Sequence, residues 1–209
     1  MFDFSEKVVV VTGAAGGLGR AFAEGFAAAN AKVVVADLDL AGVEQTAELL
    51  RASGAEAIAI RVDVTDKKST ESLARAAMEA YGGIDVLVNN AAIYAALKRA
   101  KFTEIDPIEW DKVMSVNVKG TWLCSAAAMP HLRDGGRIIN IASATVFSGS
   151  PLWMHYVASK AAVIGMTRVM AREAGARGIT VNAIAPGFTL TDASLALMED
   201  AETYGVDRG

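Results

Sequence analysis

The sequence is poor in the residues that build disulfides and metal sites. Its 209 residues include one cysteine, Cys124, and two histidines, His131 and His155. A single cysteine excludes a disulfide within the chain, and so few thiols and imidazoles argue against a zinc-type site. We therefore expect neither a disulfide framework nor a metal centre.

The chain also lacks long apolar runs, a leader pattern and a surplus of positive charge. No run of 18 apolar residues occurs, and residues 1–7 have neither the basic start nor the apolar stretch of a signal peptide. Twenty basic residues against 24 acidic ones give a net charge of −4, with no basic stripe for nucleic acid. We expect a soluble, cytoplasmic protein that binds neither membranes nor nucleic acids.

What the chain does have is an alternation of short apolar runs with amphipathic stretches of helical length. This pattern is typical of parallel β-α-β units, whose sheet is covered by helices on both faces. The length fits a single domain over residues 1–209. We predict a doubly wound α/β fold of three layers, with a ligand crevice at the carboxyl ends of the strands. The expected strands are Val8–Val11, Lys32–Ala36, Ala57–Val62, Ile84–Val88, Arg137–Ile141 and Thr180–Ile184, and the expected helices are Leu18–Ala29, Ala41–Ser53, Lys68–Tyr81, Pro107–Leu132 and Met154–Ala176.

A glycine-rich turn follows the first expected strand. Residues 12–19 read TGAAGGLG, and a helical stretch follows them. Alone, such glycines often mark only a tight loop, but here Gly13 suits the turn, Gly17 a close approach to phosphate and Gly19 helix-on-strand packing. The helix N-terminus adds free N–H groups for an anion. Because an acidic residue, Asp37, ends the next apolar run, the pattern predicts a dinucleotide site.

A tyrosine and a lysine lie four residues apart in the last expected helix. Tyr156 and Lys160 share a helix face, where an ammonium favours the phenolate and lowers the tyrosine pKa. The pair alone fits a surface tyrosine with a solvated lysine equally well. Ser143 favours chemistry, because it follows a strand end and its hydroxyl can bind a carbonyl or carbinol oxygen while Tyr156 passes the proton. Asn117, a poor helix former inside a helix, fits a capping or packing role or the binding of water or backbone.

These motifs resemble those of the classical short-chain dehydrogenase/reductase family over nearly the whole chain. The glycine motif, the Asn89-Asn90-Ala91 motif and the Pro186-Gly187 turn occur in the family's order, although Ala92 stands where glycine often closes the second motif. The resemblance implies a Rossmann-like fold and a catalytic tetrad of Asn117, Ser143, Tyr156 and Lys160. It implies that Tyr156 exchanges the hydroxyl proton, Ser143 holds the substrate oxygen, Lys160 lowers the tyrosine pKa and binds ribose, and Asn117 completes a proton relay through water.

The same resemblance implies NAD(P)-dependent hydride transfer between a nicotinamide and a secondary alcohol or ketone, in a homotetramer or homodimer. NAD is favoured over NADP, because the Asp37 carboxylate suits ribose hydroxyls and repels a 2′-phosphate. Asp63 fits either a turn or helix cap or a contact with adenine. The expected cofactor-binding residues are Gly13, Gly16, Gly17, Leu18, Gly19, Asp37, Leu38, Asp63, Val64, Asn90, Ala91, Ala92, Tyr156, Lys160, Pro186, Gly187, Thr189 and Thr191.

Apolar and aromatic residues flank the tetrad and suit a hydrophobic, even aryl-bearing, substrate. They would equally fit the core or a subunit interface. Two alternatives stay open: a 3-oxoacyl-acyl-carrier-protein reductase, and a non-catalytic nucleotide-sensing scaffold. The basic segment 98–101 fits a solvated loop or a guide for an anionic substrate. The expected pocket residues are Tyr94, Val146, Phe147, Trp153, Met154 and Phe188.

The C-terminal part carries no further strand signal after Thr180–Ile184. That strand is expected to be buried, and residues 195–198 to form one short helix. Because family members usually continue through a helix, a seventh strand and a tail, and uncovered edge strands are generally protected, we expect the C-terminal part to be missing. The alternative is a natural short form whose edge another subunit covers. Intact mass distinguishes the two, while the substrate, its stereochemistry and the physiological direction stay open.

Overall fold

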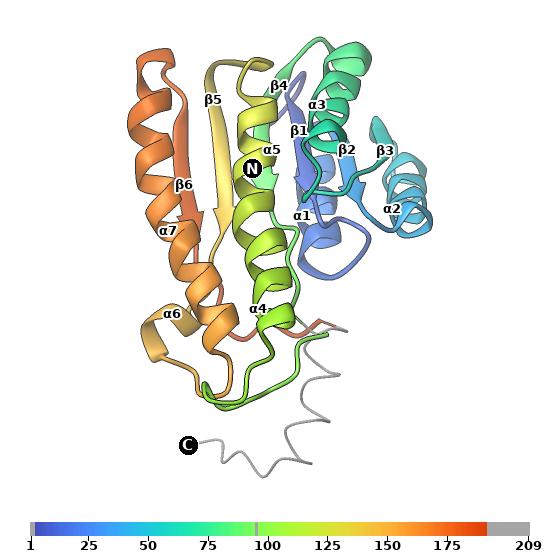
Figure 1. Ribbon diagram of the computed structural model, residues 1–209. Coiled ribbons are helices and arrows are strands. Elements are labelled where there is room, and N and C mark those ends of the chain that lie inside the picture. The colour runs from blue at the N-terminus through green and yellow to red at the C-terminus, as the bar shows by residue number, and fades with distance from the viewer. Residues whose placement is uncertain (1–2, 95, 192–209) are drawn as a thin grey trace.

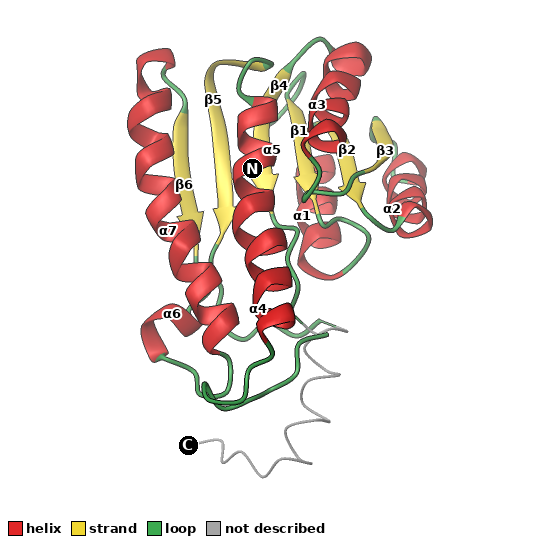
Figure 2. Cartoon of the chain, in the orientation of Figure 1, coloured by secondary structure: helices red, strands yellow, loops and turns green. Residues whose placement is uncertain are grey.

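The computed structural model describes residues 3–94 and 96–191, which form a parallel sheet between two layers of helices (Figures 1 and 2). The six strands have the order β3-β2-β1-β4-β5-β6. Strands β2 and β3 are therefore added on one side of β1, and β4, β5 and β6 on the other side. The predicted doubly wound fold is therefore confirmed. The strands are β1 (Val8–Thr12), β2 (Lys32–Asp37), β3 (Ala57–Arg61), β4 (Ile84–Asn89), β5 (Leu132–Ile141) and β6 (Thr180–Ile184). The helices are α1 (Gly17–Ala28), α2 (Leu40–Ala52), α3 (Lys67–Tyr81), α4 (Pro107–Val113), the π-helix η1 (Met114–Gly120), α5 (Thr121–Ala128), α6 (Thr145–Ser148), α7 (Met154–Ala174) and the 3₁₀-helix η2 (Gly175–Arg177).

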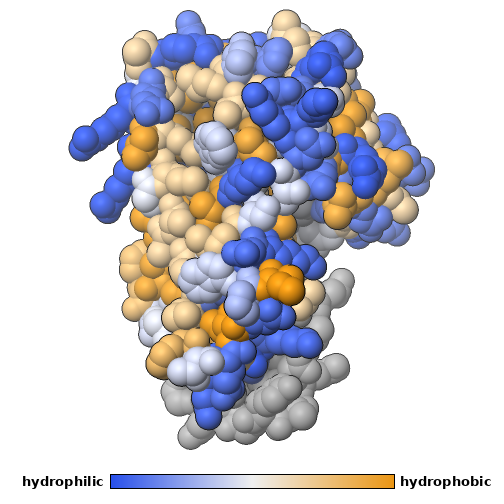
Figure 3. Space-filling model, in the orientation of Figure 1, coloured by the Kyte–Doolittle hydropathy of each residue, from blue (hydrophilic) through white to orange (hydrophobic). Residues whose placement is uncertain are grey.

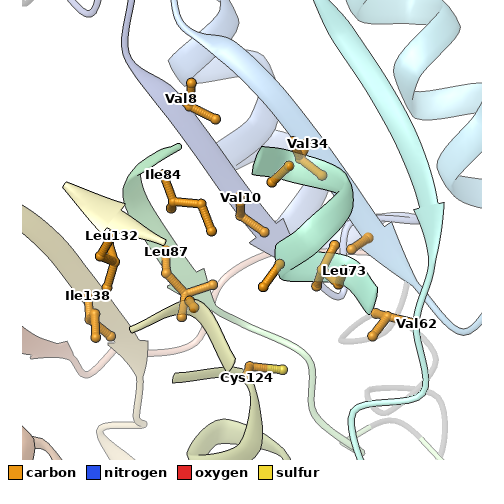
Figure 4. Packing of buried hydrophobic residues seen from close by; sticks show 14 of the residues in the cluster. Val8, Val10, Val34, Val62, Leu73, Ile84, Leu87, Cys124, Leu132 and Ile138 are labelled. Atoms are coloured by element: carbon orange, nitrogen blue, oxygen red, sulfur yellow. The ribbon is translucent and has the colours of Figure 1, made fainter. Parts of the chain in front are cut away.

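The central strands are apolar along their whole length because helices cover both faces of the sheet. In β1, Val8 and Val10 face the core beneath α3, α5 and α7, where they meet side chains such as Leu73 and Cys124 (Figure 4). Val9 and Val11 alternate to the opposite face, which α1 and α2 cover. All four valines are at most 1% exposed. This two-sided core holds the carboxyl ends of the strands in fixed register.

The edge strand β6 departs from the sequence-based expectation. It pairs with β5, and of its five residues Val181 alone is buried, while Ile184 is 47% exposed. The expectation of a buried strand is therefore wrong. The physical reason is its position at the end of the sheet, where α7 packs against it from one side.

The long helix expected over Pro107–Leu132 also differs. It runs through α4, the π-helix and α5 and ends at Ala128, while Leu132 already begins β5. Leu132 pairs with Ile84 of β4, and after a register shift Arg137 pairs with Val86. The strand is longer than predicted because it includes a bulged first segment that lacks an apolar pattern.

Several smaller expectations concern single residues or the chain ends. The single cysteine, Cys124, is buried, whereas Trp122 on α5 is 53% exposed. Among the described helices, none combines the length and apolar character that crossing a membrane requires. The short helix expected at residues 195–198 lies outside the described residues, and the expected absence of a C-terminal part stays a prediction.

Candidate active site at the carboxyl ends of the strands

A cleft of about 1310 Å³ opens at the carboxyl ends of the six strands. Residues that follow each strand line it, which is the position expected for the ligand crevice of a doubly wound sheet. All eighteen expected cofactor-binding residues lie on its wall, together with Ser143. Asn117, the remaining tetrad residue, does not line it.

The glycine-rich turn between β1 and α1 adopts the backbone that its sequence predicts. Gly13 and Gly17 have φ angles of +67° and +53°, a region that L side chains rarely adopt. A Cβ atom at Gly13 would lie 2.7 Å from Cα of Ala91, and one at Gly19 would collide with the carbonyl oxygen of Gly13. A Cβ at Gly16 would meet nothing within 4 Å. The turn is therefore tightly packed beneath and open above Gly16, on the side of the cleft.

Asn90 fixes this turn against the end of β4. Its side-chain Nδ2 donates to the carbonyl oxygens of Thr12 and Gly13, each at 3.0 Å. In return, the hydroxyl of Thr12 accepts the N–H of Asn90 at 3.1 Å and that of Ala91 at 3.2 Å. These bonds join the two strands where the strand order reverses, so the turn and the Asn-Asn-Ala segment form one wall.

Two carboxylates lie at the ends of β2 and β3. Asp37 accepts the N–H of Ala15 at 3.2 Å, which holds it beside the glycine-rich turn, and Leu38 after it is 55% exposed. Asp63 accepts the N–H and hydroxyl of Thr65, and these hydrogen bonds lower its pKa. Of the two roles left open for Asp63 from the sequence, these contacts match the turn residue. Its place on the cleft wall also leaves it available for a contact with adenine.

At the other end of the cleft, Tyr156 and Lys160 extend from α7 toward Ser143 after β5. Burial raises the pKa of Tyr156 to about 12, and a hydrogen bond with Ser143 opposes that rise. Burial lowers the pKa of Lys160 to about 8. Lys160 Nζ donates to the carbonyl of Ile141 at 2.7 Å and lies 5.7 Å from the centre of the Tyr156 ring. Burial, rather than the ammonium, governs the tyrosine pKa here, contrary to the lowering that the sequence predicts.

Thr145 is a neighbour of the site that the sequence interpretation missed. Its hydroxyl donates to Ser143 Oγ at 2.9 Å, while its backbone N–H donates to the same atom at 3.3 Å. Both bonds orient the serine hydroxyl, which lowers the pKa of Tyr156 against the effect of burial. The available signal was the hydroxyl two residues after Ser143 at a strand end.

Asn117 lies in the π-helix and is 1% exposed. Its side chain bonds the backbone of Ile93 and the hydroxyl of Ser159 behind the cleft wall. Of the roles considered from the sequence, the described contacts match the binding of a backbone group. π-Helical turns widen a helix at functional positions, which fits the placement of an amide here.

An aromatic cluster forms the substrate side of the cleft. The rings of Tyr94 and Trp153 stack with centres 5.3 Å apart, and they lie 5.2 Å and 5.7 Å from the ring of Tyr156. Phe188 also lines the cleft. The other three expected pocket residues, Val146, Phe147 and Met154, do not line it.

The reason for that difference is the position of α6 and of the start of α7. Phe147 on α6 is 77% exposed and Met154 is 43% exposed, so both face away from the cleft. His155 is fully buried, with Nε2 3.7 Å from Glu109 Oε2, and it does not line the cleft either. Two cationic side chains line the cleft, Arg99 on the loop after β4 and Lys112 on α4. Their placement depends on tertiary folding that no local pattern specifies.

Comparison with known proteins bears on this cleft. The family described as short chain dehydrogenase matches residues 7–202. A galactitol 2-dehydrogenase of Agrobacterium fabrum is 41% identical over 88% of this chain and 70% of its own length. A 3-oxoacyl-[acyl-carrier-protein] reductase of Synechocystis is 39% identical over 92% of this chain and 78% of its own. A crystal structure of a short chain dehydrogenase from Burkholderia cenocepacia in complex with NADP is 36% identical, covers 91% of this chain and 77% of that one, and superimposes with a TM-score of 0.85.

The match covers both halves of the cleft, from the glycine-rich turn to the segment after β6. The fold, the order of the motifs and the extent of the match agree with one another. On that evidence, the chain belongs to the short-chain dehydrogenase family.

Proposed function

We propose that this enzyme transfers hydride between NAD and a hydrophobic secondary alcohol or ketone. NAD(P)-dependent oxidoreduction of an alcohol or ketone is the broader activity of the family to which it belongs. The observation that carries the proposal is a single cleft with the glycine-rich turn at one end and Ser143 and Tyr156 at the other.

The residues at the first end fit a dinucleotide. Within the described part of the chain, no side chain caps the start of α1, so its first N–H groups remain for a phosphate. The open space above Gly16 leaves room for the pyrophosphate. Lys160, Pro186, Gly187 and Thr189 line the same cleft and would hold the nicotinamide half. Thr191 also lines it, but its side chain lies beside Gly17 of the glycine-rich turn, where it would meet the pyrophosphate. When bound, the nicotinamide supplies the hydride acceptor or donor.

The choice of NAD over NADP rests on Asp37. Its carboxylate ends β2 beside the glycine-rich turn, where it would accept hydrogen bonds from ribose hydroxyls. The cationic side chains on the described cleft wall lie on other parts of the chain and do not compensate the charge of Asp37. They are Arg99 on the loop after β4, Lys112 on α4 and Lys160 on α7. A 2′-phosphate would therefore meet like charge.

In the oxidative direction, Tyr156 would accept the hydroxyl proton of the alcohol while Ser143 holds its oxygen. Burial raises the pKa of the Tyr156 phenol to about 12, and the Ser143 hydroxyl acts against that rise. Near pH 7 the phenol is therefore protonated, which is the form that donates a proton to a ketone in the reductive direction. With a pKa of about 8, Lys160 is cationic at pH 7 and adds positive charge near the ring. The aromatic side chains of Tyr94, Trp153 and Phe188 support a hydrophobic substrate.

Tyr156→Phe tests the assignment. It should reduce turnover by about 10²–10⁴-fold, because it removes the transferred proton and keeps the ring. The NAD dissociation constant, measured by calorimetry, should stay near the wild-type value. Retention of more than about a tenth of the rate would contradict the role of Tyr156.

A second candidate is reduction of a 3-oxoacyl group carried on an acyl-carrier protein. One observation favours it, the 39% identity to a reductase of that name from Synechocystis. Turnover of an acyl-carrier-protein thioester at least as fast as that of arylalkyl ketones would favour this candidate. A strong preference for polyols would overturn the hydrophobic substrate, and no turnover of any alcohol or ketone would favour a nucleotide-sensing scaffold.

A homotetramer or homodimer is part of the proposal. Weakly polar and apolar side chains gather over α5 and α7 on the face shown in Figure 3. On these helices, Trp122 is 53% and Val169 56% exposed. Such a face suits a subunit interface. Light scattering of the purified protein measures the number of subunits, and a monomer would contradict the proposal. The cytoplasmic location stays a prediction.

A further inference from the structure

We propose that Arg99 binds a carboxylate of the substrate, so that the hydrophobic alcohol is a hydroxy acid. This inference rests on the proposed function, because it names the substrate class of the same cleft. The carboxylate would bind at the substrate end, beyond the aromatic rings, while the hydroxyl reaches Ser143 and Tyr156.

The loop between β4 and α4 holds Arg99 in place on both sides. The N–H of Ala100 donates to the carbonyl of Leu152 at 3.1 Å, which ties the loop to the segment before α7. The N–H of Lys98 donates to the carboxylate of Glu109 on α4, also at 3.1 Å. Arg99 itself is half-buried and lines the cleft. It is therefore a positioned residue of the wall rather than part of a solvated loop.

The guanidinium lies against the aromatic cluster. Its central carbon is 5.5 Å from the centre of the Trp153 ring, which in turn is 5.7 Å from the centre of the Tyr156 ring. These distances place the guanidinium carbon no more than about 11 Å from the centre of the tyrosine ring. Together with the hydrogen bonds at its two ends, a hydroxy acid with one or two carbons between its carboxylate and its carbinol carbon fits within that interval.

Charge along the cleft also favours an anion at this end. The acidic residues on the described wall, Asp37 and Asp63, follow β2 and β3 at the dinucleotide end. Arg99 and Lys112 line the wall on the loop and on α4, and Glu109, whose carboxylate accepts the N–H of Lys98, does not line it. A cleft with one sign of charge at one end attracts and orients a substrate of the opposite sign.

The chemistry of arginine selects the carboxylate. A guanidinium carries five N–H donors in a planar fork, and this fork matches the two oxygens of a carboxylate. It also packs over an aromatic ring, as Arg99 does over Trp153, and this contact holds the guanidinium beside the aromatic cluster. A lysine at this position would provide charge without the fork.

Matched substrates separate charge from shape. We would compare 3-hydroxy-3-phenylpropanoate with its methyl ester in the wild type, Arg99→Met, Arg99→Lys and Lys101→Met. The last is a control of equal charge change, because Lys101 lies on the same loop, is exposed and does not line the cleft.

The wild type should prefer the acid. Arg99→Met should raise the KM for the acid by roughly 10- to 100-fold and leave that for the ester nearly unchanged, since a charge-assisted hydrogen bond is lost. Arg99→Lys should restore part of the preference, and Lys101→Met should keep all of it. An equal acid-to-ester ratio in the wild type and Arg99→Met, or a wild-type preference for the ester, would overturn the inference.

A binding measurement keeps this test apart from that of the proposed function. In the presence of NAD, calorimetry would compare 3-phenylpropanoate with 3-phenylpropanamide, neither of which reacts. If the wild type oxidises no secondary alcohol, the proposed function fails. The inference about Arg99 then stands if the carboxylate binds tighter than the amide and Arg99→Met removes the difference. It falls if the two compounds bind alike.

Discussion

The side-chain amide of Asn117 pairs with both backbone groups of Ile93. Oδ1 accepts the N–H at 2.8 Å, and Nδ2 donates to the carbonyl at 3.3 Å. Nδ2 also donates to Ser159 Oγ at 3.1 Å, one residue before Lys160 on α7. One buried amide thus joins the π-helix, the loop after β4 and the helix that carries the tyrosine and the lysine. Its role in the described structure is to position the cleft wall.

Asn117→Ala should therefore affect stability as well as turnover. It leaves both polar groups of Ile93 without this partner, and we expect the free energy of unfolding to fall by about 1–3 kcal/mol. Asn182→Ala, at an exposed position of β6, is the control and should stay within about 0.5 kcal/mol of the wild type. Urea titration measures both variants. Equal stability of the two would show that the amide contacts contribute nothing.

Lys160→Met should change stability in a way that depends on pH. A pKa lowered by burial from 10.5 to about 8 corresponds to a cost of roughly 3 kcal/mol for holding the charged form in the fold. That cost is present in full below pH 8 and disappears as the pH rises from 8 towards 10.5, where the unfolded lysine also loses its proton.

The free energy of unfolding of Lys160→Met minus that of the wild type should therefore be largest near pH 7 and smaller at pH 10. Denaturant titrations at the two pH values measure this difference. Because any effect of the lost bond to Ile141 does not vary with pH, a constant difference would contradict the lowered pKa.

Asp37→Ser should weaken NAD binding and narrow its advantage over NADP. The substitution removes a carboxylate from the dinucleotide end of the cleft, and we expect the ratio of the two dissociation constants to change by roughly tenfold or more. Asp39→Ser is the matched control, because Asp39 caps α2 two residues later, serine keeps that cap, and Asp39 does not line the cleft. An unchanged ratio in Asp37→Ser would refute the assignment of NAD.

Asp85 joins three elements at the end of the sheet opposite the cleft. Burial alone would raise the pKa of the Asp85 carboxyl group. Hydrogen bonds from the N–H of Val8 at 2.9 Å and from Lys7 at 3.1 Å, together with the charge of Arg133, lower it by more, so the net pKa is lowered. A lowered pKa stabilises the fold above the unfolded pKa near 4, and that stability is lost as the pH falls through the folded value.

Asp85→Asn should therefore cost about 1–3 kcal/mol at pH 7. The difference from the wild type should shrink below pH 4, which thermal or urea unfolding would measure. The catalytic rate of the folded variant should not change, because Asp85 does not line the cleft. A cost that persists at low pH would show that the carboxylate charge is unimportant.

The sequence predicts the sheet well because buried parallel strands are short apolar runs between turns. It predicts β1, β2 and β4 within a residue, and it identifies the turn at Gly13 from glycine chemistry alone. It fails where local pattern and tertiary pairing disagree. The start of β5 at Leu132 depends on pairing with Ile84 across a bulge, and no apolar alternation marks that segment.

The same limit applies to the cleft. The residues that follow strand ends could be predicted, since all parallel strands end on one edge of the sheet. For Arg99 the sequence left a solvated loop and a guide for an anionic substrate both open, because its position depends on hydrogen bonds between its loop and two distant segments. The pKa of Tyr156 was also missed, because burial is a property of the packed protein and not of the spacing to Lys160.

The buried thiol of Cys124 gives this protein a built-in chemical reporter. It is the single cysteine in the sequence, packed between α5 and the sheet, and burial raises its pKa to about 12. A thiol reagent therefore reacts only with molecules in which this layer has opened. The labelling rate, read from one residue with no competing background, follows the opening of the core in real time and at any stage of ligand binding.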